Sequence, residues 1–441
     1  MPQSRDQEIK ERLDKTIQEF FRKKKSETRF VPGKTKVQYS GPVFDEREVQ
    51  AIIDTLLEGW LAEGRKAREF ERAFAEFVDA KECVVTNSGS SALMLSFATL
   101  TNKTLKKPFK KGDEVITVAL TFPSTINAII LNGLRPVFVD VEFDTYNMNP
   151  ALIEKMTTKR TRAILVLHHL GNPCEMDRIM EIAKMFDLRV VEDCCDAHGS
   201  VFQEKHVGSF GDMGCFSFYA AHTMTMGEGG AIVTNNPAYE PILRSLKTNG
   251  RACACSVCKV AVNPNYQCPY RWVQSETETE IYDKRTLFLN IGYKSRIMDL
   301  QAAFGLEQLK KMPLFMKQRR RNFEHMVKGL RSYEQYLVLP KATRGSDPIW
   351  FAIPLTIRNK APFTRRELVE WLENHNVETR LLLGGNLLRH PAYKSFRFKT
   401  TDLPNTNFFH TNSFYIGCYP GIDEERREYL ISVFDRFFKK L

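Results

Sequence analysis

Four cysteines and one histidine stand out in this sequence because their side chains can bind metal ions or move protons. Cys195 is separated by 57 residues from Cys253, which is followed by Cys255 and then by Cys268. Clustered thiols in a cytosolic protein indicate metal or redox chemistry rather than a disulfide framework. Four thiolates are what a [2Fe–2S] cluster needs, and a zinc ion accepts the same set. His222 can accept and release a proton near neutral pH.

An apolar strand that ends in acids precedes Cys195. The run Val190–Asp196 places Asp193 at the carboxyl end of this strand, where α/β sheets bind ligands. An aspartate there can keep a pyridinium nitrogen protonated, and the alternative is a solvated strand-end acid. Cys195 lies two residues beyond Asp193, so in an extended backbone both side chains point the same way. A cluster bound by Cys195 would then lie close to a cofactor held by Asp193.

Two further segments have features of a site for a phosphate and a flat ring. Gly89 and Ser90 lie in a Ser-rich turn that opens an apolar helix, where free backbone N–H groups favour a phosphate. An ordinary helix cap has the same composition, and alone it is the commoner explanation. Ser217 could add a hydrogen bond to the phosphate. Phe122 follows a predicted strand and could stack on a ring, although alone it is more typical of a core residue.

The segments that must position these residues alternate between strand and helix. Strands are predicted at 114–118, 137–141, 163–167, 189–192, 215–219 and 231–234, and helices at 65–78, 124–132 and 175–186. This alternation predicts an α/β fold with a mostly parallel sheet that is covered by helices on both faces. Further helices at 298–311, 313–330, 365–374 and 424–438, with a strand at 350–357, predict a smaller α+β domain.

The expected domain organisation has three parts. Residues 1–40 form a helical arm, residues 41–312 a large cofactor-binding domain, and residues 313–441 a small C-terminal domain. Periodicity stops between residues 250 and 290, inside the large domain. A loop of that length is usually functional or disordered, and its cysteines favour a functional one.

Composition narrows the class of protein. Hydrophobic residues make up 43% of the 441 residues and charged residues 27%, as in globular proteins, and no stretch is apolar enough to span a bilayer. Residues 1–25 lack the apolar core of a signal peptide, so we expect a cytoplasmic protein that does not bind membranes. The net charge is +11, but basic residues cluster only at Lys23–Lys25 and Arg319–Arg321. No nucleic-acid motif surrounds either run, so we interpret both as solvated surface and expect no nucleic-acid partner.

Taken in order, the motifs between residues 40 and 440 resemble the sugar aminotransferase branch of the fold type I pyridoxal 5′-phosphate (PLP) enzymes. The shared patterns are S-G-S at 88–90, T-F-x-x-T at 121–125, E-D-x-x-x-A-x-G at 192–199, and F-S-F-x-x-x-K then G-E-G-G at 216–222 and 227–230. The resemblance implies a homodimer with shared active sites. It assigns the cofactor's pyridine nitrogen to Asp193, its ring to Phe122 and its phosphate to Gly89, Ser90 and Ser217.

Two residues depart from that pattern. His222 stands where the family has the lysine that forms a Schiff base with PLP, and imidazole cannot form one. The cofactor must then be held noncovalently, with pyridoxamine 5′-phosphate (PMP) as the natural form. His222 could remove a proton from the C4′ carbon once PMP has condensed with a ketone. The alternative is an inactive homologue in which His222 has a structural role. Asp196 replaces a usual glutamine, which we interpret as retuning of the ring environment.

The cysteine spacing resembles the iron–sulfur sugar 3-dehydrases, which remove a C-3 hydroxyl in 3,6-dideoxyhexose biosynthesis and carry C-x57-C-x-C-x7-C. Asn263 occupies the last position of that pattern here, so the fourth ligand is Cys268 or Cys258, and we favour Cys268 because it is the last cysteine in order. The resemblance implies a [2Fe–2S] cluster held by Cys195, Cys253, Cys255 and Cys268. It also implies a nucleotide-linked 4-keto-6-deoxyhexose as substrate, with CDP favoured, and an NAD(P)H-dependent flavin/iron–sulfur reductase as partner.

Three alternatives remain at this point. A related dehydratase uses the same histidine without a cluster and regenerates PMP from glutamate. A plain sugar aminotransferase would need a lysine at position 222. A zinc-bearing protein without catalytic activity would use the same thiols for structure.

Overall fold

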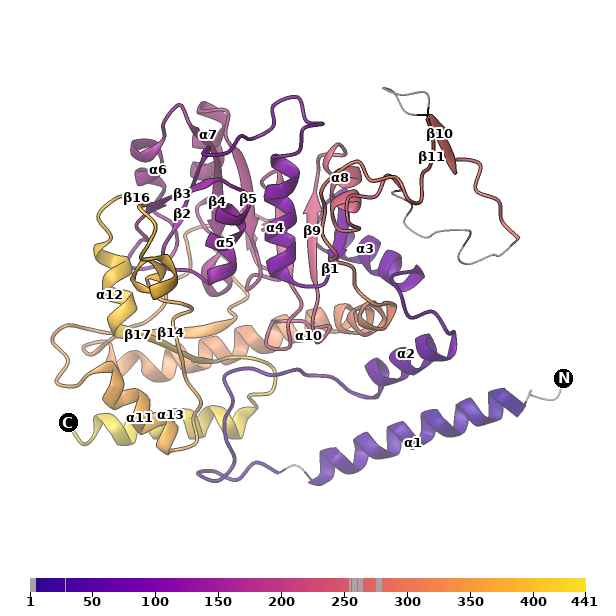
Figure 1. Ribbon diagram of the computed structural model, residues 1–441. Helices are drawn as coiled ribbons and strands as arrows, with labels where there is room; N and C mark the ends of the chain where they lie inside the picture. Colours follow the sequence, from indigo (N-terminus) through magenta and orange to yellow (C-terminus); the bar gives the residue numbers. More distant parts are fainter. Residues whose placement is uncertain (1–4, 28, 254, 256–259, 261–264, 275–279) are drawn as a thin grey trace.

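A central sheet of eight strands organises the large domain in the computed structural model, which describes residues 5–27, 29–253, 255, 260, 265–274 and 280–441 (Figure 1). The strand order is β1-β9-β8-β5-β4-β2-β3-β16. Neighbours from β8 to β16 are parallel, while β9 is antiparallel to both β1 and β8. The mostly parallel α/β sheet predicted from the sequence is thereby confirmed. The strands are β1 Glu82–Thr86, β2 Glu114–Val118, β3 Arg135–Val139, β4 Thr161–Leu167, β5 Arg189–Asp193, β8 Met213–Ser217, β9 Gly230–Thr234 and β16 Lys399–Thr400.

Helices cover both faces of this sheet. Successive residues of a strand point to opposite faces, so each face presents apolar side chains that helices bury. In β2, Val115 packs into one core cluster with residues of α4, α5 and α8, whereas Ile116 packs into another with residues of α6 and α7. The helices are α3 Arg65–Phe77, α4 Gly89–Leu100, α5 Pro123–Leu131, α6 Pro150–Met156, α7 Met176–Met185 and α8 Tyr239–Leu246. Short pieces complete this part of the chain: the 3-10 turn η1 His169–Gly171, and β6 Val201–Phe202, β7 Lys205–His206 and β13 Ser346–Asp347, which form a three-stranded sheet.

The C-terminal part builds a second core around a four-stranded sheet in the order β12-β14-β17-β15. Leu355, Phe414 and Phe434 lie in this core. Its strands are β12 Leu337–Val338, β14 Ala352–Ile357, β15 Arg380–Leu381 and β17 Ser413–Gly417. Its helices are α10 Asp299–Leu330, α11 Arg365–Asn374, α12 Pro404–Asn412 and α13 Glu424–Phe438, with 3-10 turns η2 Arg331–Tyr333, η3 Leu387–Arg389 and η4 Pro391–Tyr393.

Helix α10 corrects two sequence-based expectations. It is one continuous helix through Pro313, not two helices, because buried Met312 and Phe315 anchor it on both sides of the proline and outweigh the lost hydrogen bond. The expected domain boundary at residues 312/313 therefore falls inside a helix. Arg319 is 1% exposed, so the expected solvated surface is wrong for this residue. The expectation of a solvated surface fits Arg320 and Arg321, which point away from the core.

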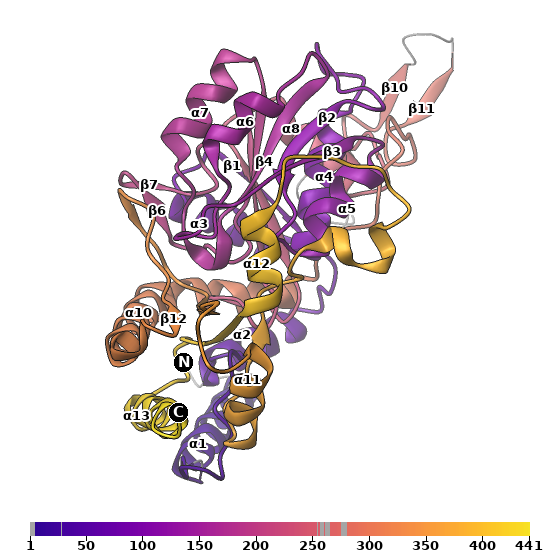
Figure 2. The ribbon, with the colours of Figure 1, turned by 90° about the vertical axis from the view of Figure 1, so that its left-hand side faces the viewer.

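Two segments extend from this body. Helix α1 Arg5–Glu27, the helix expected for the arm, lies beside α2 Glu46–Leu57 (Figure 1). Within the segment 250–290, where no regular pattern was expected, β10 Trp272–Gln274 and β11 Ile281–Asp283 pair as a small antiparallel sheet. Figures 1 and 2 show this pair projecting from the large domain on the side away from α11 and α13. None of the described helices is long and apolar enough to cross a membrane.

Candidate active site

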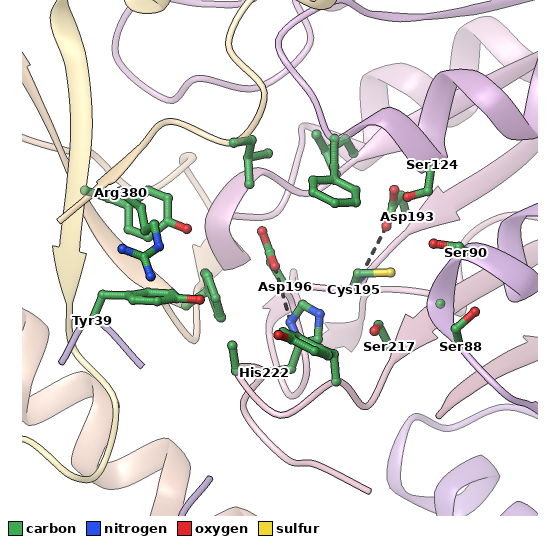
Figure 3. A pocket seen from close by; sticks show the side chains of 18 of the residues that line it. Tyr39, Ser88, Ser90, Ser124, Asp193, Cys195, Asp196, Ser217, His222 and Arg380 are labelled. Carbon is green, nitrogen blue, oxygen red and sulfur yellow. Dashed lines mark hydrogen bonds and ion pairs between the residues drawn. The ribbon is translucent and has the colours of Figure 1, made fainter. Parts of the chain in front are cut away.

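A cavity of about 620 Å³ lies where the carboxyl ends of β4, β5 and β8 meet the small domain. Carboxyl ends of parallel strands are the usual ligand site of such sheets. Figure 3 shows serines of the large domain along one side of the cavity and Tyr39 and Arg380 along the other, with Asp196 and His222 between them. The residues lining it include all seven that the sequence assigned to catalysis and cofactor binding: Gly89, Ser90, Phe122, Asp193, Asp196, Ser217 and His222.

The N-terminus of α4 forms an anion cradle at one end of the cavity. Ser88 caps the helix, since its hydroxyl accepts a hydrogen bond from the N–H of Ser91 at 3.1 Å. Helix starts leave N–H groups free and favour negative charge. A Cβ on Gly89 would lie 2.5 Å from the Cβ of Ser217 and 2.8 Å from the Sγ of Cys195, so only glycine fits this close approach of helix and strand. The cradle suits a phosphate.

Asp193 supplies a buried carboxylate next to the cradle. Its Oδ2 accepts a hydrogen bond from the Thr125 hydroxyl at 2.8 Å, and its Oδ1 accepts one from the Cys195 N–H at 3.3 Å. Burial raises its pKa, and the two hydrogen bonds oppose that rise. A carboxylate held in this way can keep a proton on a ring nitrogen. Phe122 stands at the N-cap position of α5 and is 56% exposed, so it is no core residue and its ring is available for stacking.

His222 and Asp196 form a pair in the middle of the cavity. The Nδ1 of His222 lies 3.4 Å from the Oδ1 of Asp196, and both side chains are mostly buried. Burial, followed by the field of the Arg319 cation, lowers the pKa of His222 to about 3. Burial and the nearby Asp193 raise the pKa of Asp196 to about 7. His222 is therefore neutral at physiological pH, which is the form that can accept a proton.

The loop that carries His222 is fixed by hydrogen bonds on both sides. The N–H of His222 donates to the carbonyl of Tyr219 at 3.0 Å, and the Thr225 hydroxyl donates to the carbonyl of Phe218 at 3.0 Å. The Ser40 hydroxyl donates to the carbonyl of Ala221, which ties the loop to the N-terminal segment. These bonds fix the backbone from which the His222 side chain enters the cavity.

The far wall of the cavity comes from segments to which the sequence assigned no role. The guanidinium of Arg380 stacks on the ring of Tyr39 at 4.5 Å and pairs with Glu378 at 2.6 Å. Tyr415 of β17 and Leu383, which has a left-handed backbone with φ 45°, complete the wall. These side chains come together only through tertiary folding.

The predicted metal ligands come from two parts of the described chain. Cys195 lines the cavity, whereas Cys253, Cys255 and Cys268 belong to the segment that leads into the projecting strands, and Cys258 lies outside the described residues. No three of the four described thiols lie within 4.8 Å of one another, as the ligands of a single zinc ion would. The thiolates on the two irons of a [2Fe–2S] cluster lie farther apart than the ligands of one ion, so this spacing bears on a zinc site and not on the cluster.

One other group of potential metal ligands does gather: His168, Glu192 and Cys194, all buried. The Glu192 carboxylate already accepts hydrogen bonds from three backbone N–H groups and lies 3.1 Å from the Nε2 of His168. The Nδ1 of His168 accepts one from the N–H of Cys174 at 3.1 Å. Because the polar atoms of His168 and Glu192 already have hydrogen-bond partners, we interpret this group as a structural support for β5.

Comparisons with known proteins find relatives over almost the whole chain. The DegT/DnrJ/EryC1/StrS aminotransferase family model matches residues 42–435. The lipopolysaccharide biosynthesis protein RfbH of Salmonella typhimurium is 39% identical over 98% of this chain and 98% of its own. The dTDP-4-dehydro-2,6-dideoxy-D-glucose 3-dehydratase of Saccharopolyspora spinosa is 41% identical over 98% of this chain and 93% of its own. The solved structure of E. coli GDP-4-keto-6-deoxy-D-mannose-3-dehydratase with bound hydrated PLP has a TM-score of 0.79 at 30% identity, covering 90% of this chain and 99% of that one.

Proposed function

The chain belongs to the DegT/DnrJ/EryC1/StrS aminotransferase family, and from that premise we propose that it removes the C-3 hydroxyl of a nucleotide-linked 4-keto-6-deoxyhexose. The observation that carries the proposal is His222, a neutral imidazole that lines the cavity and stands at the position of the aminotransferase lysine. Two relatives whose names describe sugar 3-dehydratases support the reaction class. We place the protein in deoxysugar biosynthesis, as a homodimer, with CDP-6-deoxy-L-threo-D-glycero-4-hexulose-3-dehydrase as the specific activity.

PMP fits the cavity, and when bound it supplies an amine for the C-4 ketone and a ring that can take up electrons. Gly89, Ser90 and Ser217 would hold its phosphate, and Phe122 would stack on its ring. Asp193 would hold a proton on the ring nitrogen, a role that suits its buried carboxylate. His222 would remove a proton from the C4′ carbon, and the ionised Asp196 would stabilise the positive charge that His222 then carries.

Replacing the C-3 hydroxyl by hydrogen consumes two electrons and two protons and releases water. These electrons must come from a donor, and we propose an NAD(P)H-dependent flavin/iron–sulfur reductase acting through a [2Fe–2S] cluster on Cys195, Cys253, Cys255 and Cys268. The support is the number and spacing of these thiols and the place of Cys195 in the cavity.

The test uses full-length protein purified without oxygen, loaded with PMP and given CDP-, GDP- or dTDP-linked 4-keto-6-deoxyhexoses with reduced reductase. We expect a product lighter by one oxygen atom, iron and sulfide in the protein, and an EPR signal on reduction. Cys268→Ser and Cys258→Ser are matched variants, and only the first should abolish the signal. Formation of an amino sugar, or zinc without turnover, would contradict the proposal.

A second candidate is a cluster-free 3-dehydratase that regenerates PMP from glutamate. It is favoured by the structural likeness to the GDP-4-keto-6-deoxy-D-mannose-3-dehydratase of E. coli. Turnover that requires glutamate and no reductase, in protein without iron, would select it.

A further inference from the structure

A second cavity, of about 480 Å³, lies at the end of the central sheet opposite to the candidate active site. Its walls include Glu114 and Arg135, the first residues of β2 and β3, whereas the candidate active site lies at the carboxyl ends of strands parallel to them. The segment 395–399 closes the second cavity, and its last residue begins β16, which pairs in parallel with β3 (Figure 1). The volume lies within the range of small-molecule sites, about 300 to 1,000 Å³.

Positive charge is in excess around the second cavity. Glu114 is the one carboxylate among the described residues that line it, against four cations: Arg135, Arg160, Arg397 and Lys399. Glu114 is only 3% exposed, and its carboxylate already accepts hydrogen bonds from the Thr158 hydroxyl at 2.7 Å and from the Nη2 of Arg160 at 3.0 Å. One engaged carboxylate does not balance four cations, so the field in this cavity attracts anions.

Two of the four cations have no acidic partner. The Nζ of Lys399 donates to the carbonyl of Met156 at 3.0 Å, and Arg160 holds Glu114. The guanidinium groups of Arg135 and Arg397 form no ion pair with any residue that the structure describes. A guanidinium presents several N–H donors in one plane and can bind two oxygens of a phosphate at once. Since one of these arginines lies at the sheet and the other on the closing segment, a phosphate between them would be held from two sides.

An anchored pair of aromatic rings forms another side of the second cavity. The ring of Phe398 packs edge-on against the buried ring of Phe138, with centroids 5.2 Å apart. The ring of Phe396 stacks on Phe398 with centroids 5.5 Å apart and only 12° between the planes. Phe396 lines the cavity and is 45% exposed. A large exposed ring that is fixed in this way offers a platform on which a flat ligand can stack.

We propose that the second cavity binds a nucleotide at a site separate from the candidate active site. The base would stack on Phe396, and the phosphates would lie between Arg135 and Arg397. A nucleotide joins a flat ring to several negative charges, whereas inorganic phosphate lacks the ring and a neutral aromatic compound lacks the charge. This inference does not depend on the reaction proposed above, because the two cavities share no lining residue.

A continuous segment connects the two cavities. Leu383 lines the first cavity, and Phe396 lines the second. Between them the N–H of Gly384 donates to the carbonyl of Thr121 at 3.0 Å, and the hydroxyl of Tyr393 donates to the Oδ1 of Asn127 at 2.9 Å. A nucleotide in the second cavity would therefore order a segment that also carries part of the wall of the first.

Equilibrium dialysis of the full chain loaded with PMP tests the site, with CDP, ADP and inorganic pyrophosphate as probes. We expect the double variant Arg135→Gln/Arg397→Gln to lose one nucleotide site per chain relative to wild type, and each single variant to bind at that site about tenfold or more weakly. Phe396→Ala should weaken nucleotide binding about tenfold, the usual contribution of base stacking, and leave pyrophosphate binding unchanged. Lys394→Gln, on the same segment but outside the cavity, is the matched control and should bind as wild type does. An unchanged number of sites in the double variant would overturn the proposal.

Hydrogen–deuterium exchange of the full chain locates the site without any measurement of turnover. Added CDP should slow the exchange of amides in residues 133–137 and 393–400 in wild type and in Lys394→Gln, but not in the double variant. Protection confined to the first cavity, at residues 88–91, would overturn the second site. Pyrophosphate that binds as tightly as CDP, with no effect of Phe396→Ala on either, would overturn a nucleotide as its ligand.

Discussion

Replacing Asp196 by asparagine should make the protein more stable and less active. Asp196→Asn keeps the shape of a side chain that is 7% exposed and removes its charge. Burial and Asp193 raise the pKa of Asp196 from 3.8 to about 7. Between these two values the folded state holds a proton that the unfolded state has already lost. Stability therefore falls as pH rises through this window.

The size of the effect follows from the width of that window. One pKa unit corresponds to about 1.4 kcal/mol, so the ionised Asp196 costs about 4 kcal/mol of unfolding free energy above about pH 7. Asparagine carries no charge at any pH. The variant should exceed the wild type by up to about 4 kcal/mol near pH 8, by progressively less on acidification, and by nothing below about pH 4. His222, whose pKa burial lowers to about 3, is present in both proteins.

Urea unfolding followed by circular dichroism between about pH 5 and pH 8 measures this gap, and kcat measured on the same samples gives the functional cost. We expect turnover to fall by about 10²- to 10⁴-fold, the usual contribution of acid–base groups. Asp402→Asn, at an exposed carboxyl, is the control and should change neither quantity. An Asp196→Asn protein no more stable than wild type near pH 8 would refute the buried charge. Full activity in that variant would refute the proposed role of Asp196 as the charge partner of His222.

The remaining predictions address the two ends of the cavity. Gly89→Ala should weaken PMP binding at least about tenfold, because the new Cβ would lie 2.5 Å from Ser217, and overpacking typically costs about 1 to 3 kcal/mol. If a fluorescence titration of Gly89→Ala with PMP gave the wild-type affinity, the anion cradle would be excluded as the phosphate site. Cys195→Ser should bind PMP normally but lose the reducible iron signal and turnover, whereas a full iron content and EPR signal would remove Cys195 from the ligand set. Arg380→Gln should raise KM for the nucleotide sugar about 10- to 100-fold with little change in kcat, since a charged hydrogen bond contributes about 1.5 to 3 kcal/mol; a loss confined to kcat would contradict a substrate-binding role.

The sequence predicted which residues meet at one end of the cavity, because these residues sit in local motifs at strand ends and helix starts. Asp193 and Ser217 end β5 and β8, and Gly89 and Phe122 stand at the starts of α4 and α5. Once the strands are known to be parallel, their carboxyl ends must share one edge of the sheet. Local pattern and topology therefore determine that half of the cavity together.

The other half depended on tertiary packing that no local pattern contains. Tyr39 and Arg380 lie far apart in the chain and meet only because the segment at Val37 bridges to Val377. The run Arg319–Arg321 has the composition of a surface segment. Only the packing of α10 against Trp350 and Phe351 buries Arg319. At Pro313 the local signal was misleading. The proline predicted a break between two helices, but burial of the neighbouring side chains keeps α10 continuous.

His222 also has a consequence for the supply of cofactor. A lysine that bonds its cofactor retains it after dilution, but a histidine leaves occupancy to mass action between the cavity and the free pool. Ligand binding then adds RT ln(1 + [L]/Kd) to the stability of the fold, which is about 2.7 kcal/mol when free PMP is a hundredfold above Kd. Dialysis should therefore lower the melting temperature as well as the activity, and added PMP should restore both. With the cofactor held as proposed, the concentration of free PMP would set both the fraction of the protein that is loaded and the stability of the loaded fold.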